Sequence, residues 1–374
     1  MDRDAGGSGG SQRAQRDTTS PYIGHAASAH PCAEVKGEYR LCFELASEDS
    51  ANVYLGMFAG EQRHQRPVLV KRMHAQLAKR VEAVERFFDE AQLAALVNHP
   101  AVASVCDFGR SGDSYFLALD YFVGESLQRI ADTLRRPIEQ NDPIDKGDQR
   151  RLPFYATRLF ADLCEGLHAI HEARDADGDL LNIVHRDVTP ANLFLLYDGS
   201  VRIMNFSGAS SRQRLSQTGM GIPVDKLGYL SPEQLKQEPV DRRGDIWTLG
   251  VVLWEFLTHS RLFAADNVAA AVDAVQSGAI GRASTINRFV PAELDKVISR
   301  AVNRKVDARY RTAREMALDL EEIMARRNEI VSAATLGDWL QALFPGELAQ
   351  QRALLRRAQT ISRPPPPMPT STPS

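Results

Sequence analysis

Cysteine is scarce in this sequence, and the four residues present, Cys32, Cys42, Cys106 and Cys164, are scattered along the chain. No two of them have the short spacing of a structural zinc site, and there are too few for a small disulfide-stabilised domain. Because scattered cysteines are typical of reducing compartments, we expect a cytoplasmic protein without a disulfide framework.

Long hydrophobic runs and a surplus of one charge are also absent. The first ten residues, MDRDAGGSGG, contain no apolar segment like that of a signal peptide, so none is expected. The best apolar candidate, residues 249–257, is much shorter than the roughly 20 residues that span a bilayer. Because 45 Lys and Arg residues balance 48 Asp and Glu residues, the composition gives no reason to expect nucleic acid or an anionic membrane as a partner.

The middle of the chain changes from strand patterns to helix patterns. Short β-type runs alternate with polar turns between residues 39 and 73, and residues 81–97 then show helical spacing of apolar side chains. Strand character returns at 102–108 and 115–122. After Glu125 helices are expected at 155–173, 245–258, 265–276, 292–303 and 313–327. A β-rich part followed by an α-rich part indicates an α+β fold with two lobes.

The two ends of the chain differ from its middle. We expect residues 1–36, rich in Gly, Ser, Ala, Asp and Arg, to be a disordered arm, and the Pro-rich residues 359–374 a disordered tail. Residues 328–358 form a predicted helical extension, interrupted at Pro345-Gly346. One helical face carries Leu336, Trp339, Leu340, Leu343 and Phe344. We expect this face to pack onto the helical lobe; the alternative is an exposed helix that binds a partner.

Several short motifs follow one another in a fixed order. They are VLVK, which ends at Lys71; Glu90 on the next helix; IVHRDVTPANLFL, with His185, Arg186, Asp187 and Asn192; GYLSPE at 228–233; DIWTLG at 245–250; and DARYRTA around Arg309. In this order they resemble the protein kinase family, and in style the bacterial serine/threonine (Hanks-type) kinases. The resemblance covers about residues 39–327. It implies the bilobal protein-kinase fold over residues 37–327, with an N-lobe at about 37–119 and a C-lobe at about 123–327.

The resemblance implies roles for four polar residues of these motifs. Lys71 would contact the α- and β-phosphates of ATP, and Glu90 would hold Lys71 by an ion pair. Asp187 would accept the proton of the attacking hydroxyl of a protein substrate. Asn192, on the same loop, would ligate a divalent cation.

The resemblance also assigns the adenine side of the site and several scaffold positions. The backbone of Asp120, Tyr121 and Phe122 would form the hinge, directly after the gatekeeper Leu119, and Val53 and Leu69 would line the nucleotide site. Leu69 stands where the family usually has alanine, so it adds bulk beside the adenine ring. The scaffold positions are Glu233 and Arg309 as an ion pair, Asp245 at the catalytic loop, and His185 and Phe206 as stacked members of the hydrophobic spine.

One departure from the family concerns the metal. Where the family has Asp-Phe-Gly, this chain has Asn205-Phe206-Ser207. Magnesium prefers charged oxygen ligands, and Asn205 offers one neutral carbonyl oxygen instead. The lost charge–charge interaction is on the order of several kcal/mol, so Asn205 is predicted to be a degenerate metal ligand and magnesium binding is doubtful.

A second departure concerns the phosphates. The glycine positions of the phosphate-binding loop fall on Ala46, Glu48 and Ala51, with Asp49 beside them. Glycines there allow backbone N–H groups to approach phosphates closely, and side chains block that approach. Because Glu48 and Asp49 also bring negative charge, we expect ATP to bind weakly or not at all.

A third departure is a possible exchange of residues. Thr189 replaces a lysine that the family places near the γ-phosphate, and Lys226 replaces a threonine near the same place. Lys226 is therefore a candidate for the missing catalytic cation; the alternative is an exposed surface lysine. The activation segment also carries Ser210, Ser211, Ser216 and Thr218 among Arg212 and Arg214, so an active kinase is a candidate to phosphorylate it, with Arg186 as the phosphate's partner.

These features leave three interpretations. The favoured one is a pseudokinase that acts as a signalling or binding module, because two independent phosphate-handling features are lost together. The second is an active serine/threonine kinase with atypical metal use, because Lys71, Glu90, Asp187 and Asn192 are all retained. A small-molecule phosphotransferase of related fold is the third, and GYLSPE argues against it.

Overall fold

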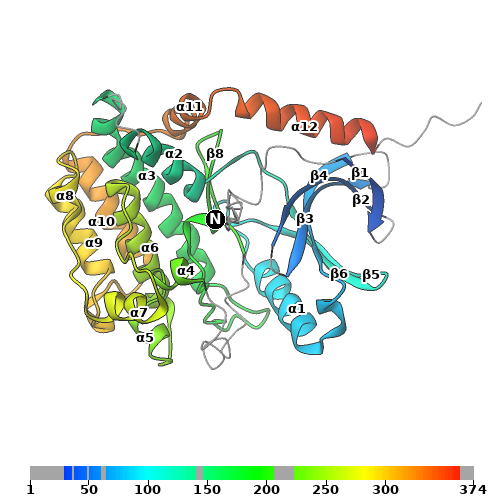
Figure 1. The fold of residues 1–374 in the computed structure, drawn as a ribbon, viewed down its shortest axis with the longest axis horizontal. Coiled ribbons are helices and arrows are strands. Elements are labelled where there is room, and N and C mark those ends of the chain that lie inside the picture. Colours follow the sequence, from blue (N-terminus) through cyan, green and yellow to red (C-terminus); the bar gives the residue numbers. More distant parts are fainter. Residues whose placement is uncertain are drawn as a thin grey trace, which may run out of the picture.

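The computed structural model describes residues 29–35, 38–48, 50–59, 65–139, 146–205 and 223–362. They form a β-rich N-lobe and a larger helical C-lobe, joined by the segment that follows β6 (Figure 1). The expected α+β bilobal fold is confirmed. No helix in these residues is long and apolar enough to cross a membrane.

The N-lobe is an antiparallel sheet with strand order β1-β2-β3-β4-β6-β5. Its strands are β1 (Ala29–Val35), β2 (Tyr39–Ser47), β3 (Ala51–Ala59), β4 (Gln65–Met73), β5 (Val105–Ser111) and β6 (Ser114–Asp120). Helix α1 (Val81–Ala95) buries Phe87, Glu90, Ala91 and Ala94. This three- and four-residue spacing places Glu90 on the same inward stripe as the apolar residues.

The first strand corrects the predicted disordered arm. Residues 29–35 pair with β2 in an antiparallel ladder, with Val35 opposite Tyr39, and Val35 is fully buried. Pro31 lacks a backbone N–H, which weakens the strand pattern in the sequence. An edge strand tolerates it, and the register shifts between Ala29 and Ala33. Residues 1–28 of the predicted arm lie outside the described part of the chain.

The C-lobe is built around one buried helix. Its helices are α2 (Leu127–Glu139), α3 (Lys146–His171), α4 (Val224–Leu227), α5 (Pro232–Leu235), α6 (Arg242–Thr258), α7 (Val268–Ser277), α8 (Ala283–Ile286), α9 (Ala292–Ala301) and α10 (Ala313–Arg326). Helix α6 is buried continuously from Gly244 to Thr258, because it is apolar on all sides and lies in the centre of the lobe. A small sheet, β7 (Gly124–Ser126), β8 (Leu193–Leu196) and β9 (Val201–Ile203), faces the N-lobe (Figure 1).

The C-terminal extension contains two helices, α11 (Ala333–Leu343) and α12 (Glu347–Ile361). As predicted, α11 packs onto the C-lobe: Trp339 is buried, with its ring 5.3 Å from that of Tyr155. The interruption lies at Gly346, whose φ of 88° favours glycine, and α12 continues past the predicted end at residue 358.

Candidate functional site

The predicted ion pair between Lys71 and Glu90 is present within the N-lobe. Lys71 lies near the end of β4 (Gln65–Met73), opposite Val53 of β3 and Leu117 of β6, and it is almost completely buried. Its Nζ lies 3.9 Å from Oε1 of Glu90 on α1. A buried lysine needs such partners, because an unpaired charge away from water is costly. The sheet and α1 therefore hold the cation at the face of the N-lobe that looks into the cleft.

Lys71 has a second acidic partner that the sequence did not predict. Its Nζ donates a hydrogen bond of 3.3 Å to Oε2 of Glu48, in the stretch between β2 and β3. The backbone of Glu48 is held on both sides, because its N–H donates to the carbonyl of Ala51 and its carbonyl is 2.8 Å from Nε2 of His74. The sequence placed Glu48 beside the phosphate position as a repulsive charge. The structure places its carboxylate directly on the cation that would bind the phosphates.

A buried carboxylate of the C-lobe anchors the catalytic loop, which carries His185, Arg186 and Asp187. Asp245 of α6 accepts hydrogen bonds from the backbone N–H groups of His185 and Arg186, at 2.8 and 2.7 Å, and its Oδ2 lies 2.8 Å from Nε2 of His171. Burial raises the pKa of Asp245, but the hydrogen bond and charge of His171 and the Arg186 N–H outweigh it, so the pKa lies below its ordinary value. Arg186 has a φ of 63°, a strained conformation that this anchor stabilises.

His185 is buried in the same loop. Burial lowers the pKa of its imidazole, which favours the neutral ring. Its Nε2 lies 3.1 Å from the carbonyl oxygen of Met204, and its Nδ1 accepts a hydrogen bond from the Asp187 N–H. The loop that carries Asp187 is thus fixed to the strand end that carries Asn205. The predicted stacking partner, Phe206, lies outside the described residues.

Asn192 uses its amide nitrogen to fold the loop and leaves its oxygen toward Asn205. It ends the short 3-10 turn Pro190–Asn192, and its Nδ2 donates to the carbonyl of Asp187 at 2.8 Å and to Oγ1 of Thr189 at 3.3 Å. Its Oδ1 accepts a hydrogen bond of 3.3 Å from Nδ2 of Asn205. The oxygen that would ligate a cation therefore has a protein donor.

Asn205 connects the two lobes through its side-chain amide. It follows β9 with a φ of 71°, a left-handed conformation that asparagine adopts more readily than most residues. Its Oδ1 accepts a hydrogen bond from Lys71 Nζ at 3.3 Å, while its Nδ2 donates to Asn192. The amide thus supplies an acceptor on one side and a donor on the other, which a carboxylate cannot do without a bound cation or proton.

The apolar part of the predicted nucleotide site forms one buried cluster. Val53, Leu69 and Leu119 of the N-lobe belong to it together with Phe194 and Met204 of the C-lobe. Tyr121 and Phe122 pack against this cluster, and the rings of Phe122 and Phe194 meet edge to face at 5.2 Å. At the start of the hinge, the N–H of Asp120 donates to the carbonyl of Ser104. Phe194 was not among the residues predicted from the sequence; its place two residues after Asn192, in the buried strand β8, was the available signal.

The proposed exchange between Thr189 and Lys226 has no contact to support it. Lys226 lies exposed in α4, and within the described residues no hydrogen bond or ion pair joins it to Asp187. Thr189 is buried and uses its hydroxyl to accept from Asn192. The catalytic role of Lys226 stays a prediction. Several predicted residues lie outside the described part of the chain: Asp49, Phe206, Ser207, Ser210, Ser211, Arg212, Arg214, Ser216 and Thr218.

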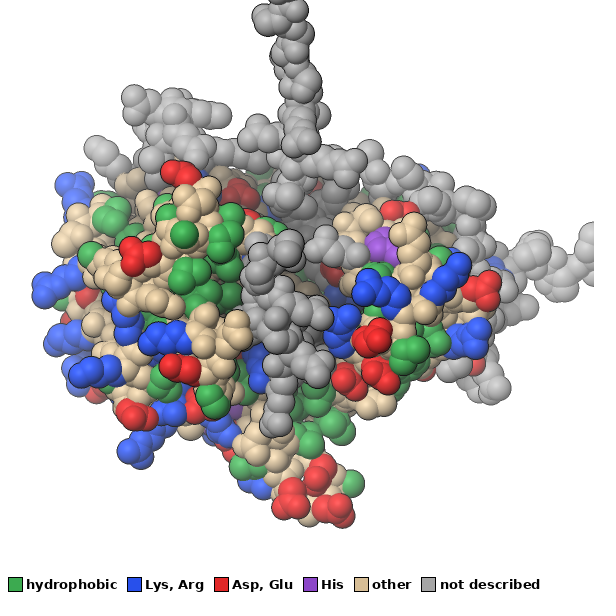
Figure 2. Space-filling view, turned by 60° about the horizontal axis from the view of Figure 1, so that its bottom comes forward, with side chains coloured by type: hydrophobic (Ala, Val, Ile, Leu, Met, Phe, Trp, Pro, Cys, Tyr) green, Lys and Arg blue, Asp and Glu red, His purple; other side chains and the backbone are tan. Residues whose placement is uncertain are grey.

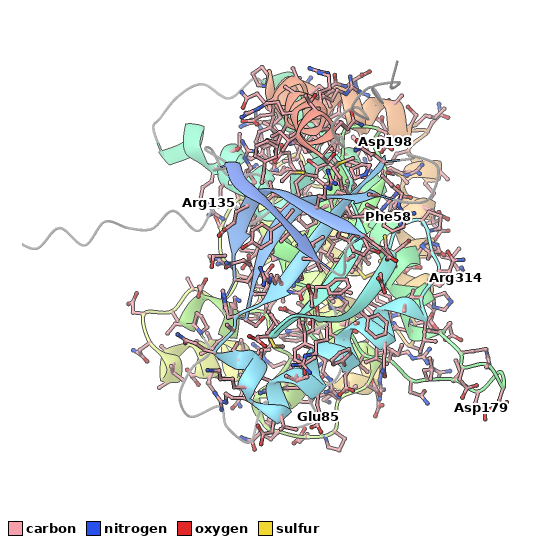
Figure 3. All side chains as sticks on the ribbon, turned by 90° about the vertical axis from the view of Figure 1, so that its right-hand side faces the viewer. Phe58, Glu85, Arg135, Asp179, Asp198 and Arg314 are labelled. Atoms are coloured by element: carbon pink, nitrogen blue, oxygen red, sulfur yellow. The ribbon has the colours of Figure 1, made fainter. Side chains whose placement is uncertain are left out.

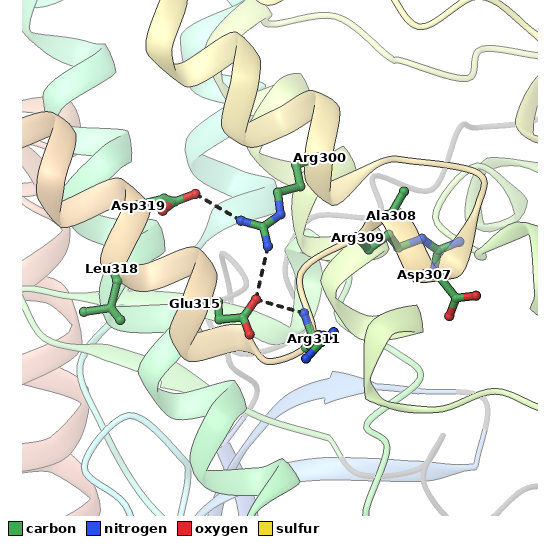
Figure 4. Close-up of a pocket in the computed structure, with 8 residues that line it drawn as sticks. All are labelled: Arg300, Asp307, Ala308, Arg309, Arg311, Glu315, Leu318 and Asp319. Carbon is green, nitrogen blue, oxygen red and sulfur yellow. Dashed lines mark hydrogen bonds and ion pairs between the residues drawn. The ribbon is translucent and has the colours of Figure 1, made fainter.

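Two other surface regions of the described residues carry charged side chains of both signs (Figure 2, Figure 4). Figure 2 shows Lys and Arg side chains interspersed with Asp and Glu side chains over one face. A separate cavity of about 510 Å³ lies between α9 and α10 (Figure 4). Three of its charged side chains pair with one another: Arg300 lies 3.2 Å from Glu315 and 3.6 Å from Asp319. The guanidinium of Arg300 is therefore already paired with two carboxylates. The candidate site remains the region between the lobes where Lys71, Asn192 and Asn205 meet.

Comparison with known proteins identifies relatives of this chain. The family model described as Protein kinase domain matches residues 49–319. The chain is 32% identical to the tyrosine-protein kinase MasK of Myxococcus xanthus over 345 residues, which are 92% of this chain and 52% of MasK. It is 35% identical to the serine/threonine-protein kinase PknB of Mycolicibacterium smegmatis over 268 residues, 70% of this chain and 39% of PknB. The chain thus spans about half or less of the length of these curated relatives.

A solved structure shows the same fold. The crystal structure of the Mycobacterium tuberculosis PknI kinase domain superposes with a TM-score of 0.55 at 22% sequence identity. The match covers 79% of this chain and 99% of that domain. At this identity the likeness concerns the fold alone.

Proposed function

The chain belongs to the protein kinase domain family, with bacterial serine/threonine kinases among its relatives, and from that membership we propose that it is a pseudokinase. In this proposal it handles Mg-ATP poorly and acts as a signalling or binding module. One observation carries the proposal: the amide of Asn205 joins Lys71 to Asn192 at the position where a kinase holds its metal ion.

The chemistry of magnesium explains why this arrangement weakens catalysis. A cation would have to displace the Asn205 Nδ2 from the Asn192 oxygen, and it would gain only neutral amide oxygens from these two residues. Magnesium strongly prefers charged oxygen ligands. The missing charge–charge interaction is on the order of several kcal/mol at an effective dielectric constant of ~20. Since ~1.4 kcal/mol is a factor of ten in rate, phosphoryl transfer would slow by several powers of ten.

The phosphate side of the site supports the same proposal. Glu48 holds Lys71 at 3.3 Å, so an incoming phosphate would have to displace this carboxylate and would be repelled by it. The buried lysine is already neutralised by Glu48 and Glu90. ATP binding is therefore proposed to be weak, and any nucleotide would bind without a strong dependence on magnesium.

An active serine/threonine kinase is the second candidate, and a specific arrangement favours it. The Lys71–Glu90 pair is formed, and Asp245 anchors the loop that carries Asp187. In that case Asp187 would accept the proton of a protein hydroxyl while the oxygen of that hydroxyl attacks the γ-phosphorus of ATP. The bond between the γ-phosphorus and the bridging oxygen of the β-phosphate would break. One relative is named a tyrosine kinase and another a serine/threonine kinase, so an assay must also identify which residue type, Ser, Thr or Tyr, accepts the phosphate.

Protein partners follow from either candidate. We propose that this cytoplasmic chain binds a protein partner or substrate rather than nucleic acid, and that an active kinase phosphorylates its activation segment. The family supports protein as the partner class. The balanced charge of the chain gives no basic surplus for nucleic acid.

A phosphotransfer assay tests the pseudokinase proposal. Incorporation of labelled γ-phosphate into the chain itself and into a generic protein substrate is compared between the wild type and Asp187→Asn. This control keeps the shape of Asp187 and removes its ability to accept the proton. We expect equal, background incorporation for both. Transfer by the wild type that clearly exceeds the Asp187→Asn background, onto Ser, Thr or Tyr, would establish the active-kinase candidate instead.

A further inference from the structure

Helix α12 leaves the C-lobe and lies across the N-lobe. It begins at Glu347, beside the end of α11, and ends at Ile361 over β2, β3 and β4. Figure 1 shows it along the edge of the molecule, across both lobes, and Figure 3 shows it at the opposite edge of the N-lobe from Glu85 on α1. Besides the hinge and the Asn205 side chain, α12 is thus a further connection between the lobes in the described part of the chain.

The first anchor of α12 is an ion-pair network in the C-lobe. Arg129 of α2 donates to Glu347 at 2.8 Å and to the fully buried Glu125 at 2.7 Å. The same guanidinium lies 4.9 Å from the ring centre of Phe344, at the end of α11. Because these charges are largely buried, they are weakly screened by solvent and hold the helix start firmly.

The second anchor lies directly after the hinge. Gln351 is almost completely buried, and its Nε2 donates to Oε1 of Glu125 at 2.9 Å. The same carboxylate oxygen accepts from the Tyr197 hydroxyl at 2.8 Å. One turn into α12, the helix is therefore fixed to β7, the first strand of the C-lobe after the hinge segment.

The third anchor lies on the N-lobe sheet. Ala358 is fully buried in a cluster with Cys42 and Phe43 of β2 and Leu55 and Met57 of β3, and Leu354 and Leu355 pack against it. Polar contacts reinforce the cluster. Arg40 donates to the Ser362 carbonyl at 2.6 Å, and the Arg357 guanidinium lies 5.1 Å from the ring centre of Phe43.

Two residues relay this contact to the candidate site. Leu45 of β2 and Tyr121 of the hinge pack against the α12 cluster and also against the cluster that contains Val53 and Leu69. The helix is thus one layer of side chains away from the wall of the nucleotide cleft. A change at α12 can reach the cleft through contiguous packing.

We propose that α12 is a clamp that fixes the two lobes at one separation, so the cleft opens only when α12 detaches from one of them. The hinge alone is a single chain segment, which permits rotation of one lobe against the other. A second, rigid connection with anchors on both sides removes that freedom. This inference concerns the helix and the hinge, and it holds whether the cleft binds ATP or not.

The test breaks the N-lobe anchor of α12 and measures whether the hinge becomes more mobile. Ala358→Asp places a charge in the N-lobe cluster, and Gln359→Asp, on the adjacent exposed position, is its matched control. Hydrogen exchange is measured for the full chain by mass spectrometry. For Ala358→Asp we expect exchange about tenfold faster or more at hinge residues 120–122 as well as at β2 and β3, with α11 unchanged. Faster exchange confined to α12 and the strands beneath it would overturn the clamp.

A second pair of variants tests the anchor at Gln351, next to the hinge. Gln351→Ala removes the hinge anchor, and Gln350→Ala changes the neighbouring exposed glutamine. We expect only Gln351→Ala to speed exchange at the distant β2 and β3, by several-fold. This pair also decides the question if Ala358→Asp does not fold, since unchanged exchange in β2 and β3 in Gln351→Ala would refute the clamp.

Discussion

The side-chain amide of Asn205 binds two partners at once. Its oxygen accepts from Lys71 and its nitrogen donates to Asn192, so it satisfies both a cation and an acceptor. An aspartate at this position would face the Asn192 oxygen with a second acceptor, and a metal ion would be needed between them. The substitution therefore changes the hydrogen-bond pattern of the whole site.

Glu48 provides a prediction at the same scale. Glu48→Gln keeps the size of the side chain but removes the negative charge 3.3 Å from Lys71 Nζ. We expect ATP to bind about tenfold more tightly in the presence of EDTA, equivalent to ~1.4 kcal/mol, because its phosphates no longer compete with a carboxylate. Isothermal titration calorimetry measures this difference. Glu82→Gln on the exposed start of α1 is the control, and equal affinities for both variants would contradict the role of Glu48.

The sequence predicted some of these residue contacts and not others. The Lys71–Glu90 pair follows from the motif order, because both residues lie on regular elements whose packing the family fixes. The Glu48–Lys71 contact depends on the path of an irregular stretch between β2 and β3. Residue spacing does not determine such a path, so the negative charge of Glu48 could be predicted but its partner Lys71 could not.

Among the structural elements, the connection from α5 to η6 (Val306–Ala308) depends on one buried ion pair. Arg309 donates to both carboxylate oxygens of Glu233, at 2.7 and 2.8 Å, and both side chains are buried. The hydrogen bond and charge of Arg309 overcome the effect of burial, which alone would raise the pKa of Glu233, and keep that pKa below its ordinary value. This geometry confirms the scaffold pair that the motifs GYLSPE and DARYRTA predicted.

Breaking this pair should be costly. Arg309→Met leaves the Glu233 carboxylate buried without its partner, and we expect the free energy of unfolding to fall by about 3–5 kcal/mol. Urea unfolding measures the loss. Arg314→Met breaks the exposed pair with Glu165 and serves as the control, for which little change is expected. A similar small loss in both variants would show that the buried pair does not stabilise the lobe.

The anchor of the catalytic loop gives a pH prediction. Because the pKa of Asp245 is lowered in the folded state, its stabilisation is present above the unfolded value of about 4 and is lost as the pH falls through the folded pKa. We expect Asp245→Asn to be less stable than the wild type at pH 7, and this difference in unfolding free energy to shrink toward pH 3. Chemical unfolding at several pH values measures it, and a constant difference would contradict the account.

Element boundaries show where sequence patterns were insufficient. The apolar spacing predicted α11 and its packing face, because Trp339 and Leu340 lie on one side of a regular helix. The strand β1 was missed because its stability comes from backbone pairing with β2 rather than from an alternating pattern of its own. Pairing across the sheet is a tertiary property that a short run of residues does not show.

The whole molecule is a kinase fold with an added constraint between its lobes. The motif order was sufficient to predict a kinase fold with two lobes. It did not reveal that α12 crosses from α11 to the N-lobe sheet, because an amphipathic pattern shows which face of a helix is apolar but not which surface covers it. If α12 holds the lobes together, the cleft of this chain is restrained independently of its ligands.

Thermal unfolding with ATP, with and without magnesium, tests the central claim most directly. A ligand that binds the folded state raises the unfolding temperature, and at a fixed ligand concentration a tighter ligand raises it more. We expect no magnesium-dependent shift for the wild type, because Asn205 and Asn192 satisfy each other without a cation. In Asn205→Asp, magnesium should raise the unfolding temperature of the ATP complex by a few degrees. A shift in the wild type that requires both ATP and magnesium would contradict the claim.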